Sequence, residues 1–515
     1  MKRLLAAFLA VLLLALCGCG QEGEYTPTGD GLSYDEDYTG PVNTRPQEEN
    51  DQVLSLPYYA DLTLNPLHCA DYTNRTVLSL VYQGLFTVNR DYQVQPILCG
   101  RYTMSNDMRT YTFYVDEKAT FSDGSAVRPQ DVLTSLLVAK ESKYYSGRFL
   151  HVRSMDLTED GGIQIRLDTA FENLPILLDI PVVPELEQAN PHPLGTGPYV
   201  WDTTGSQWLL RRNSRWWCEV EMPVTAQVIT LQPAESTLQI RDDFQFADLN
   251  VVCTDPCSDS YADYRCDYEL WDCETGIFTY LAFCDESKVF NSPEMRAAVT
   301  YAIDREDLSA NYFRSFAIPA SLPASPHSPY YNTSLAAQYS FDPERFARTV
   351  SECGKTGAEV VLMVNIEDSA RVRTAKVIAK MLEAGGLKVT LKEIPSNMYS
   401  YNFNVKEYDL YIGQTKLSPN MDLSAFFSPG GALSRGGVSN AEAYELCKQA
   451  LENFGNIYTL HKTVMDQGLL VPILFNTMAV YAARGNITGL APSRDNVFYY
   501  SIGKTMEQAF FWSDN

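Results

Sequence analysis

The sequence predicts an α/β protein built from several domains. The chain has 515 residues, 45% of them hydrophobic, with 30 Gly and 27 Pro, an ordinary globular composition with room for two to four domains. The α/β signature lies in the second half. Residues 360–364 form a short apolar strand, a helical stripe over 375–382 stops at Gly385-Gly386, and 388–394 and 408–412 predict two more strands. Strand, helix, strand and strand with short links are typical of an α/β domain.

Strand signals dominate the first part of the folded chain. Residues 53–59 are apolar and aromatic, and alternate residues of 111–115 would share one face. Residues 163–167 and 179–183 predict two further strands, and 199–252 alternates strands with turns.

Two helices are predicted in the same part. Residues 74–86 form a helix that runs into a turn at Gly84. Pro129 opens the second helix and Asp131 lies in its first turn. Three leucines are expected on its buried side: Leu133, Leu136 and Leu137.

Helix signals are clearer further along the chain. Ser292-Pro293-Glu294 supply an N-cap, a proline at the first helical position and an acid in the first turn. The helix that they open has Met295, Val299 and Ala302 facing inward. Residues 441–467 predict one or two helices, and 470–482 predict a return to strand.

The first twenty residues predict export and a lipid anchor. A basic start at 1–3 precedes an apolar run of 13 residues from Leu4 to Leu16, too short to span a bilayer and right for a signal-peptide core. The run ends in a pattern that resembles a bacterial lipobox, with Gly18 before Cys19. We expect removal of the signal peptide 1–18, diacylation of Cys19 and attachment to the extracytoplasmic face of the cell membrane. Cleavage to a free secreted protein is the alternative.

The charge balance excludes one class of partner. The 40 Lys and Arg against 64 Asp and Glu give a net charge of −24, so the chain repels phosphate backbones and no nucleic-acid binding is expected. Residues 20–51 are rich in Gly, Glu, Asp, Thr and Pro and cannot bury a core. Together with Cys19 they predict a lipid-anchored acidic linker over 19–51.

Ten cysteines follow Cys19, and four of them lie between Cys253 and Cys273 with the spacing C-x3-C-x8-C-x6-C. A structural zinc site usually carries a C-x2-C knuckle, which this stretch lacks, so no metal is expected. One or two local disulfides and buried free thiols both remain open, because the predicted compartment permits disulfides.

Local motifs for catalysis are missing from the sequence. There is no G-x-S-x-G, no phosphate-cradling G-x-x-x-x-G-K-[ST], no G-x-G-x-x-G and no H-E-x-x-H. The five histidines are scattered, and each is expected to be an ordinary surface or core residue. No cofactor is expected and an enzyme is disfavoured, although the abundant carboxylates allow a chance pair of the kind that glycosidases use.

Several short motifs follow one another along residues 53–515. They are LNP at 64–66, VYQGLF at 81–86, YTF at 111–113, FSDGS at 121–125, QDV at 130–132, GTGPY at 195–199, LRRN at 210–213, WW at 216–217 and RAAVTYAIDR at 296–305. In this order and spacing they resemble the family 5 extracytoplasmic solute-binding proteins, which are the oligopeptide-, dipeptide- and nickel-binding receptors of ABC importers.

The resemblance implies a two-lobed periplasmic-binding-protein-like fold, type II and cluster C, with an additional domain. The chain would cross between the lobes twice, near 275 and 470, and these crossings would form a hinge. The implied parts are a discontinuous lobe I over 52–72, 187–276 and 470–515, an additional domain II over 73–186, and lobe III over 277–469.

The resemblance also implies a function and a site. Such a receptor binds a peptide ligand in the cleft between its lobes, closes around it and delivers it to an ABC importer permease, as a monomer. In peptide receptors of the family an Asp of lobe III pairs with the α-amino group of the ligand. That position falls on Asp422, for which capping of the next helix is the alternative role. Gln414, Thr415 and Tyr280 are further cleft candidates, because each begins or ends a strand that should point at the cleft.

Other functions stay open on the same residues. The same fold would also serve a sensor of signalling peptides, or a binder of a non-peptide solute such as a sugar oligomer or a metal chelate. A secreted hydrolase or an adhesin that shares the motifs is a third possibility, and only the hydrolase would consume its substrate.

Overall fold

A computed structural model describes most of the chain beyond the predicted linker. The described residues are 53–219, 224, 226–258, 261, 263–436, 439–483, 488–493 and 496–503. The predicted signal peptide, Cys19 and the acidic linker lie outside them, as do residues 504–515 of the predicted lobe I.

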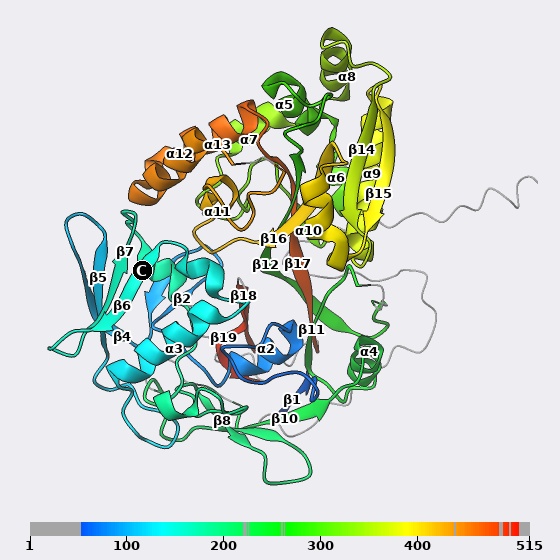
Figure 1. The fold of residues 1–515 in the computed structure, drawn as a ribbon. Helices are drawn as coiled ribbons and strands as arrows, with labels where there is room; N and C mark the ends of the chain where they lie inside the picture. The colour runs from blue at the N-terminus through cyan, green and yellow to red at the C-terminus, as the bar shows by residue number, and fades with distance from the viewer. Residues whose placement is uncertain are drawn as a thin grey trace, which may run out of the picture. The chain divides into compact units, whose positions relative to one another are not determined.

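A seven-stranded mixed sheet organises the second half of the described chain (Figure 1). Its order is β11-β17-β12-β16-β14-β15, and β13 pairs with β17. The last of these strands in sequence, β17, therefore lies between β11 and β12. The strands are β11 (Val251–Thr254), β12 (Tyr268–Phe283), β13 (Ala317–Pro319), β14 (Glu359–Asn365), β15 (Lys388–Ile394), β16 (Leu410–Lys416) and β17 (Val471–Ala483).

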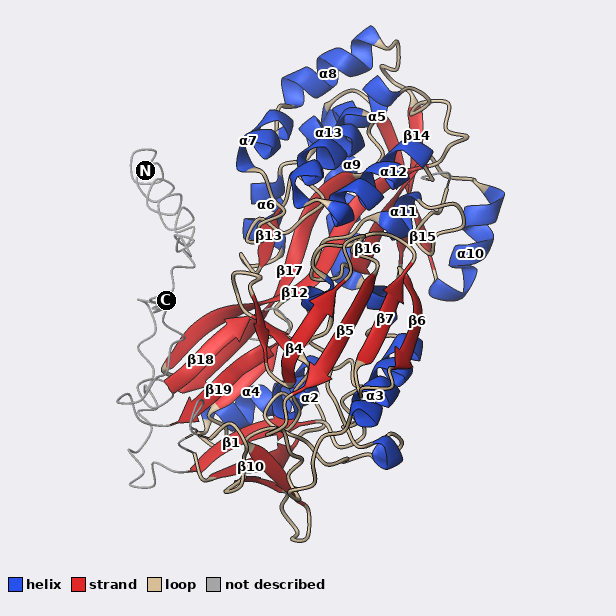
Figure 2. Ribbon diagram, turned by 90° about the vertical axis from the view of Figure 1, so that its left-hand side faces the viewer, coloured by secondary structure: helices blue, strands red, loops and turns tan. Residues whose placement is uncertain are grey.

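Helices pack around this sheet (Figures 1 and 2). α9 packs on β14 and β15, α5 packs on α8 and β17, and α12 packs on α13. The helices are α5 (Pro293–Ala302), α6 (Arg305–Tyr312), α7 (Thr333–Ala336), α8 (Pro343–Glu352), α9 (Ser369–Ala384), α10 (Ser396–Val405), α11 (Ser424–Phe427), α12 (Ala441–Glu452) and α13 (Ile457–Asp466).

Local signals predicted this half well. The Ser292 side chain accepts the Met295 N–H at 3.2 Å, and Met295, Val299 and Ala302 are buried as expected. The three predicted strands are β14, β15 and β16, and α9 ends before Gly385. The one or two helices predicted over 441–467 are α12 and α13.

Four smaller sheets complete the described chain (Figure 2). The order is β1-β10-β9-β8 in one and β4-β5-β7-β6 in another, and β2-β3 and β18-β19 are two-stranded. The strands are β1 (Val53–Tyr58), β2 (Phe86–Val88), β3 (Val94–Pro96), β4 (Cys99–Met104), β5 (Thr110–Val115), β6 (Val152–Leu157), β7 (Ile163–Leu167), β8 (Tyr199–Asp202), β9 (Leu209–Arg212), β10 (Val228–Pro233), β18 (Thr488–Ser493) and β19 (Asn496–Gly503).

The first two described helices differ from the sequence predictions. The first, α2 (Tyr72–Leu78), ends well before Gly84. The second, α3 (Pro129–Glu141), starts at the predicted proline, but Leu137 is 44% exposed. The buried stripe of α3 runs through Val132, Leu136 and Ala139, and one further residue along the helix turns the side chain about 100° toward solvent.

Two other segments differ from the sequence prediction. Residues 179–183 form no strand, because Pro181 has no N–H for a ladder and makes only an isolated bridge with Gly84. Residues 199–252 contain a helix that was not predicted, α4 (Thr237–Gln245). Ser236 caps it, and only Ile240 and Phe244 are buried along it, too few for a visible periodic signal.

Motifs that identify the chain act mainly through backbone packing. A Cβ at Gly195 would lie 2.0 Å from the carbonyl oxygen of Val81, so this position requires glycine. Asp123 accepts hydrogen bonds from the backbone and hydroxyl of Ser125 in a turn where Gly124 has φ +91°. Arg305 is buried and donates to the carbonyl oxygens of Ala320 and Pro472.

β12 and β17 are the two longest described strands and pair antiparallel along much of their length. β12 covers position 275 and β17 begins at Val471, directly after position 470, and the sequence predicts the interlobe crossings near 275 and 470. Their register shifts between Glu274 and Phe278, and again between Thr279 and Tyr280. Such irregularities bend a strand and raise its twist. The boundaries of the individual lobes stay a prediction.

All ten cysteines beyond Cys19 are free thiols in the structure. Eight of them are buried, and Cys266 and Cys353 are half-buried. Of the alternatives left open by the sequence, the structure has the free thiols, including the four between 253 and 273.

Candidate functional site

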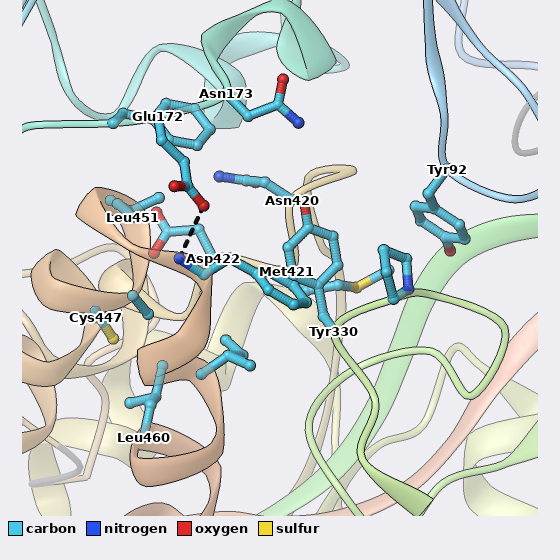
Figure 3. A pocket seen from close by; sticks show the side chains of 15 residues that line it. Tyr92, Glu172, Asn173, Tyr330, Asn420, Met421, Asp422, Cys447, Leu451 and Leu460 are labelled. Carbon is cyan, nitrogen blue, oxygen red and sulfur yellow. Dashed lines mark hydrogen bonds between the residues drawn. The ribbon is translucent and has the colours of Figure 1, made fainter. Parts of the chain in front are cut away.

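A pocket of about 260 Å³ lies where five separate parts of the chain meet, one of which is the turn between β2 and β3 that carries Tyr92 (Figure 3). One wall comes from the loop after β7, another from a loop before α7, a third from the loop before α11, and the last from α12 and α13. The lining residues are Tyr92, Phe171, Glu172, Asn173, Pro329, Tyr330, Asn420, Met421, Asp422, Cys447, Ala450, Leu451, Phe454, Ile457 and Leu460.

Two polar side chains of the pocket differ in their hydrogen bonding. Glu172 is exposed, and its Oε1 accepts the Phe454 backbone N–H at 2.8 Å, the bond drawn in Figure 3. Asn420 is only 6% exposed, and its Oδ1 is buried without a hydrogen-bond partner in the described chain. An orphaned buried acceptor is costly, so this amide oxygen is suited to a donor brought by a ligand.

Asp422 lines the same pocket, and its carboxylate is held by contacts within the protein. Its Oδ1 accepts hydrogen bonds from the backbone N–H and the hydroxyl of Ser424, at 2.9 and 2.7 Å. Ser424 is the first residue of α11. Its Oδ2 lies 2.8 Å from Nε2 of His151. Burial raises the pKa of Asp422, but His151 and Ser424 outweigh burial and the net pKa is lowered. The N-cap of α11 is Leu423, which makes no side-chain cap bond, so Asp422 holds the turn one residue before the cap and does not itself cap the helix.

The other three candidates lie on the strand pair β12 and β16. Tyr280 faces Gly413 and Thr415 faces Phe278 in the register, so Tyr280 and Thr415 share one face of the sheet. Tyr280 is buried and packs edge-on against Phe426 of α11 with ring centroids 5.0 Å apart. Burial raises the pKa of Tyr280 to about 12.

Gln414 lies on the opposite face of the sheet from Tyr280. It faces Thr279, to whose hydroxyl its Nε2 donates at 3.3 Å, and its Oε1 accepts a bond from Arg371 at 2.9 Å. Arg371 also pairs with Asp368 at the start of α9. The structure thus brings Tyr280 and Thr415 together and separates Gln414 from them, and only Asp422 of the four lines the pocket.

A second polar cluster surrounds Glu274 at the first register shift of β12. Its carboxylate accepts bonds from the Tyr92 hydroxyl at 2.8 Å and the Ser325 hydroxyl at 3.0 Å, and lies 2.5 Å from Nδ1 of His327. Burial raises the pKa of Glu274, but His327 and the two hydroxyls lower it overall. The same contact raises the pKa of His327 above its usual value.

Sequence reasoning missed His151, Glu172, Glu274 and His327. His151 and Asp422 are separated by 271 positions, and Glu274 and His327 by 53, so no local spacing signals either pair. His151 and His327 were expected to be ordinary surface or core residues, whereas each contacts a carboxylate.

Two absences hold for the described residues alone. No group of three or more His, Cys, Asp or Glu within them is arranged to hold a metal ion. None of their helices combines the length and the apolar character that crossing a bilayer requires.

Comparison with known proteins agrees with the motifs. The profile of the bacterial extracellular solute-binding proteins, family 5 (Middle), matches residues 93–434. The glutathione-binding protein GsiB of Pectobacterium atrosepticum is 25% identical over 344 residues, which are 64% of this chain. The alignment spans 66% of the length of that relative.

Solved structures share the fold. The ABC transporter substrate-binding protein CtaP of Listeria monocytogenes superposes with a TM-score of 0.71 at 18% identity, over 88% of this chain and 99% of its own. The oligopeptide-binding protein AppA of Bacillus subtilis, in complex with a nonapeptide, gives 0.61 at 17% identity, over 86% and 97%.

This chain belongs to the bacterial extracellular solute-binding proteins of family 5. The predicted fold class, α/β and two-lobed with the type II arrangement of periplasmic binding proteins, is confirmed by these matches.

Proposed function

We propose that this protein is the substrate-binding lipoprotein of an ABC importer, and that it captures peptides and delivers them to a membrane permease. Membership of family 5 carries the proposal. A relative named for binding glutathione, a peptide-like molecule, and a structural neighbour holding a nonapeptide support a peptide-type ligand. On this proposal the protein is a receptor and not an enzyme.

The anchor and location are part of the same proposal. Cys19 follows the signal-peptide pattern, so we place the protein on the extracytoplasmic face of the cell membrane, held by two acyl chains and acting as a monomer. The acidic linker 19–51 would hold the folded part away from the anionic lipid surface. The predicted lobes would close on the ligand by bending where β12 and β17 pair.

Asp422 is proposed to bind the α-amino group of the peptide. An ionised carboxylate has about four acceptor positions. Two on Oδ1 are taken by Ser424 and one on Oδ2 by His151, which leaves one toward the pocket. An ammonium there would make a charge-assisted hydrogen bond. Tyr280 and Thr415 are proposed to contact the ligand from one face of the β12–β16 strand pair. Gln414 is proposed to contact it from the opposite face.

The same fold supports a second candidate function, in which the ligand is a metal chelate. A structural neighbour, NikA of Brucella suis, was solved in complex with Fe(III)-EDTA. The acidic lining of the pocket argues against an anionic chelate, because like charges repel.

Native mass spectrometry of the full chain, extracted gently in detergent and never unfolded, tests the proposal. We expect bound masses of several hundred daltons that fragment into amino-acid series. A sugar or chelate mass would replace the peptide by the second class of ligand. Shortened products after incubation with defined peptides would contradict the receptor role, and loss of the adduct in Asp422→Ala would support the proposed amine contact.

A further inference from the structure

The pocket of Figure 3 has an unusual charge composition. Its lining carries two carboxylates, Glu172 and Asp422, and none of its 15 residues is Lys, Arg or His. Asp422 already has a counter-charge from outside the lining, His151. Glu172 receives only the backbone N–H of Phe454, and no ion pair to it occurs among the described residues. The negative charge of Glu172 is therefore left for something that enters the pocket.

A second, independent observation indicates that a ligand brings a hydrogen-bond donor to the same place. The Asn420 side chain reaches the pocket wall in Figure 3, is more than nine-tenths buried, and its Oδ1 has no partner in the described chain. An acceptor that is desolvated without a hydrogen bond costs free energy until a donor arrives. A carboxylate and an amide oxygen together match a group that carries both positive charge and several N–H donors.

The remaining walls suit the stem of such a group. Leu451, Ile457 and Leu460 from α12 and α13 line the pocket with apolar surface. The volume of about 260 Å³ corresponds to roughly nine water molecules, enough for the four-carbon stem and ammonium of lysine. Long basic side chains bury their methylenes on apolar surface while the charged end seeks polar partners.

We propose that the pocket binds the basic side chain of the first residue of a peptide, with its ammonium or guanidinium between Glu172 and Asn420. The inference rests on the proposed function and names its substrate class: peptides that begin with lysine or arginine. The α-amino group of the same residue lies within the reach of Asp422. Burial, with the charge of Glu172 nearby, raises the pKa of Tyr330 in the pocket wall, which agrees with an uncompensated carboxylate there.

Calorimetric titration of the full chain in detergent tests the proposal. The probes are alanine peptides of two to five residues whose first residue is lysine, norleucine or glutamate, at one salt concentration. Norleucine keeps the stem and removes the charge. We expect the lysine peptides to bind about 10- to 100-fold more tightly than the norleucine peptides, the range of one hydrogen bond between charged groups, and the glutamate peptides to bind most weakly.

Three variants assign the effect. Glu172→Gln keeps an acceptor for the Phe454 N–H and removes the charge, so it should abolish the preference for lysine over norleucine peptides. Asn420→Leu keeps the bulk of the side chain and should reduce the preference, with a melting curve to confirm folding. Glu117→Gln, an exposed glutamate outside the pocket lining, is the matched control and should change nothing.

The outcomes separate this inference from the proposed function. Equal binding of lysine and norleucine peptides, or a preference that survives Glu172→Gln, overturns the inference and leaves a peptide receptor. Failure of every peptide to bind overturns both.

Discussion

The imidazole Nε2 of His151 lies 2.8 Å from Oδ2 of Asp422, and both side chains are about nine-tenths buried. His151 follows the helical turn before β6, and Asp422 precedes α11, so the contact joins two predicted domains. Burial alone would lower the pKa of His151, but Asp422 outweighs burial and raises it, so the contact favours the protonated imidazole.

The stability of the protein should depend on this pair in a particular direction. Because the pKa of His151 is raised on folding, its contribution is fully present below the unfolded value near 6.5 and is lost as pH rises through the folded pKa. The pKa of Asp422 is lowered, so its contribution is lost as pH falls through its folded pKa. We expect His151→Gln to lower the free energy of unfolding by about 1–3 kcal/mol at pH 5.5 and by less at pH 9.

Urea unfolding at the two pH values measures this difference. His68→Gln, at an exposed position, is the control and should leave stability unchanged at both. Equal losses for His151→Gln at pH 5.5 and pH 9 would mean that the pair is not ionised.

The Glu274 cluster predicts a shifted histidine titration. The Glu274 carboxylate raises the pKa of His327, while burial acts in the opposite direction. Glu274→Gln removes the charge and should bring the pKa of His327 down to its usual range or below it. The ring-proton signals of the five histidines, followed by NMR against pH, report this value, and His327→Gln assigns the signal. An unchanged titration in Glu274→Gln would show that the contact is absent in solution.

Gly413 should be intolerant of any side chain because of Tyr280. A Cβ at Gly413 would lie 2.3 Å from Cζ of Tyr280, whose ring is held against Phe426. We expect Gly413→Ala to destabilise the protein by about 1–3 kcal/mol through overpacking. A double-mutant cycle with Tyr280→Leu should recover part of the loss, whereas additive losses would place the strain elsewhere.

The ten free thiols predict a specific labelling pattern. Cys266 and Cys353 are half-buried and the other eight are buried, so iodoacetamide should modify at most two of these ten in the native protein and all ten after denaturation. Intact-mass measurement counts the labels. Labelling in denaturant that requires prior reduction would reveal disulfides and contradict the free-thiol assignment.

Much of the second half was predictable because its signals are local. A capping Ser292, an apolar run at 360–364 and a glycine pair after α9 each act within a few residues. Where the local signal was weak, the prediction failed. α4 carries only two buried side chains, and the segment 179–183 is interrupted by a proline that cannot join a ladder.

The candidate site was less accessible from the sequence. Asp422 was identified through a resemblance, and the structure places it in a pocket wall. Its partner His151 and the neighbouring Glu172 lie more than 200 positions away, and contacts over such separations depend on packing that no short spacing records. The separation of Gln414 from Tyr280 follows from strand alternation, which becomes visible only once the register is known.

The position of β17 has a consequence for how the chain is made. This strand pairs with both β11 and β12, yet about 190 residues separate its start from the end of β12. A ribosome adding about 5–20 residues per second needs roughly 10–40 s to cover that interval. Until β16 is made β12 lacks both of its neighbours, and until β17 is made it lacks one, so the largest sheet is finished only near the end of translation. On the proposed export, the chain can still cross a membrane unfolded until almost all of it has been synthesised, because its largest sheet is incomplete until then.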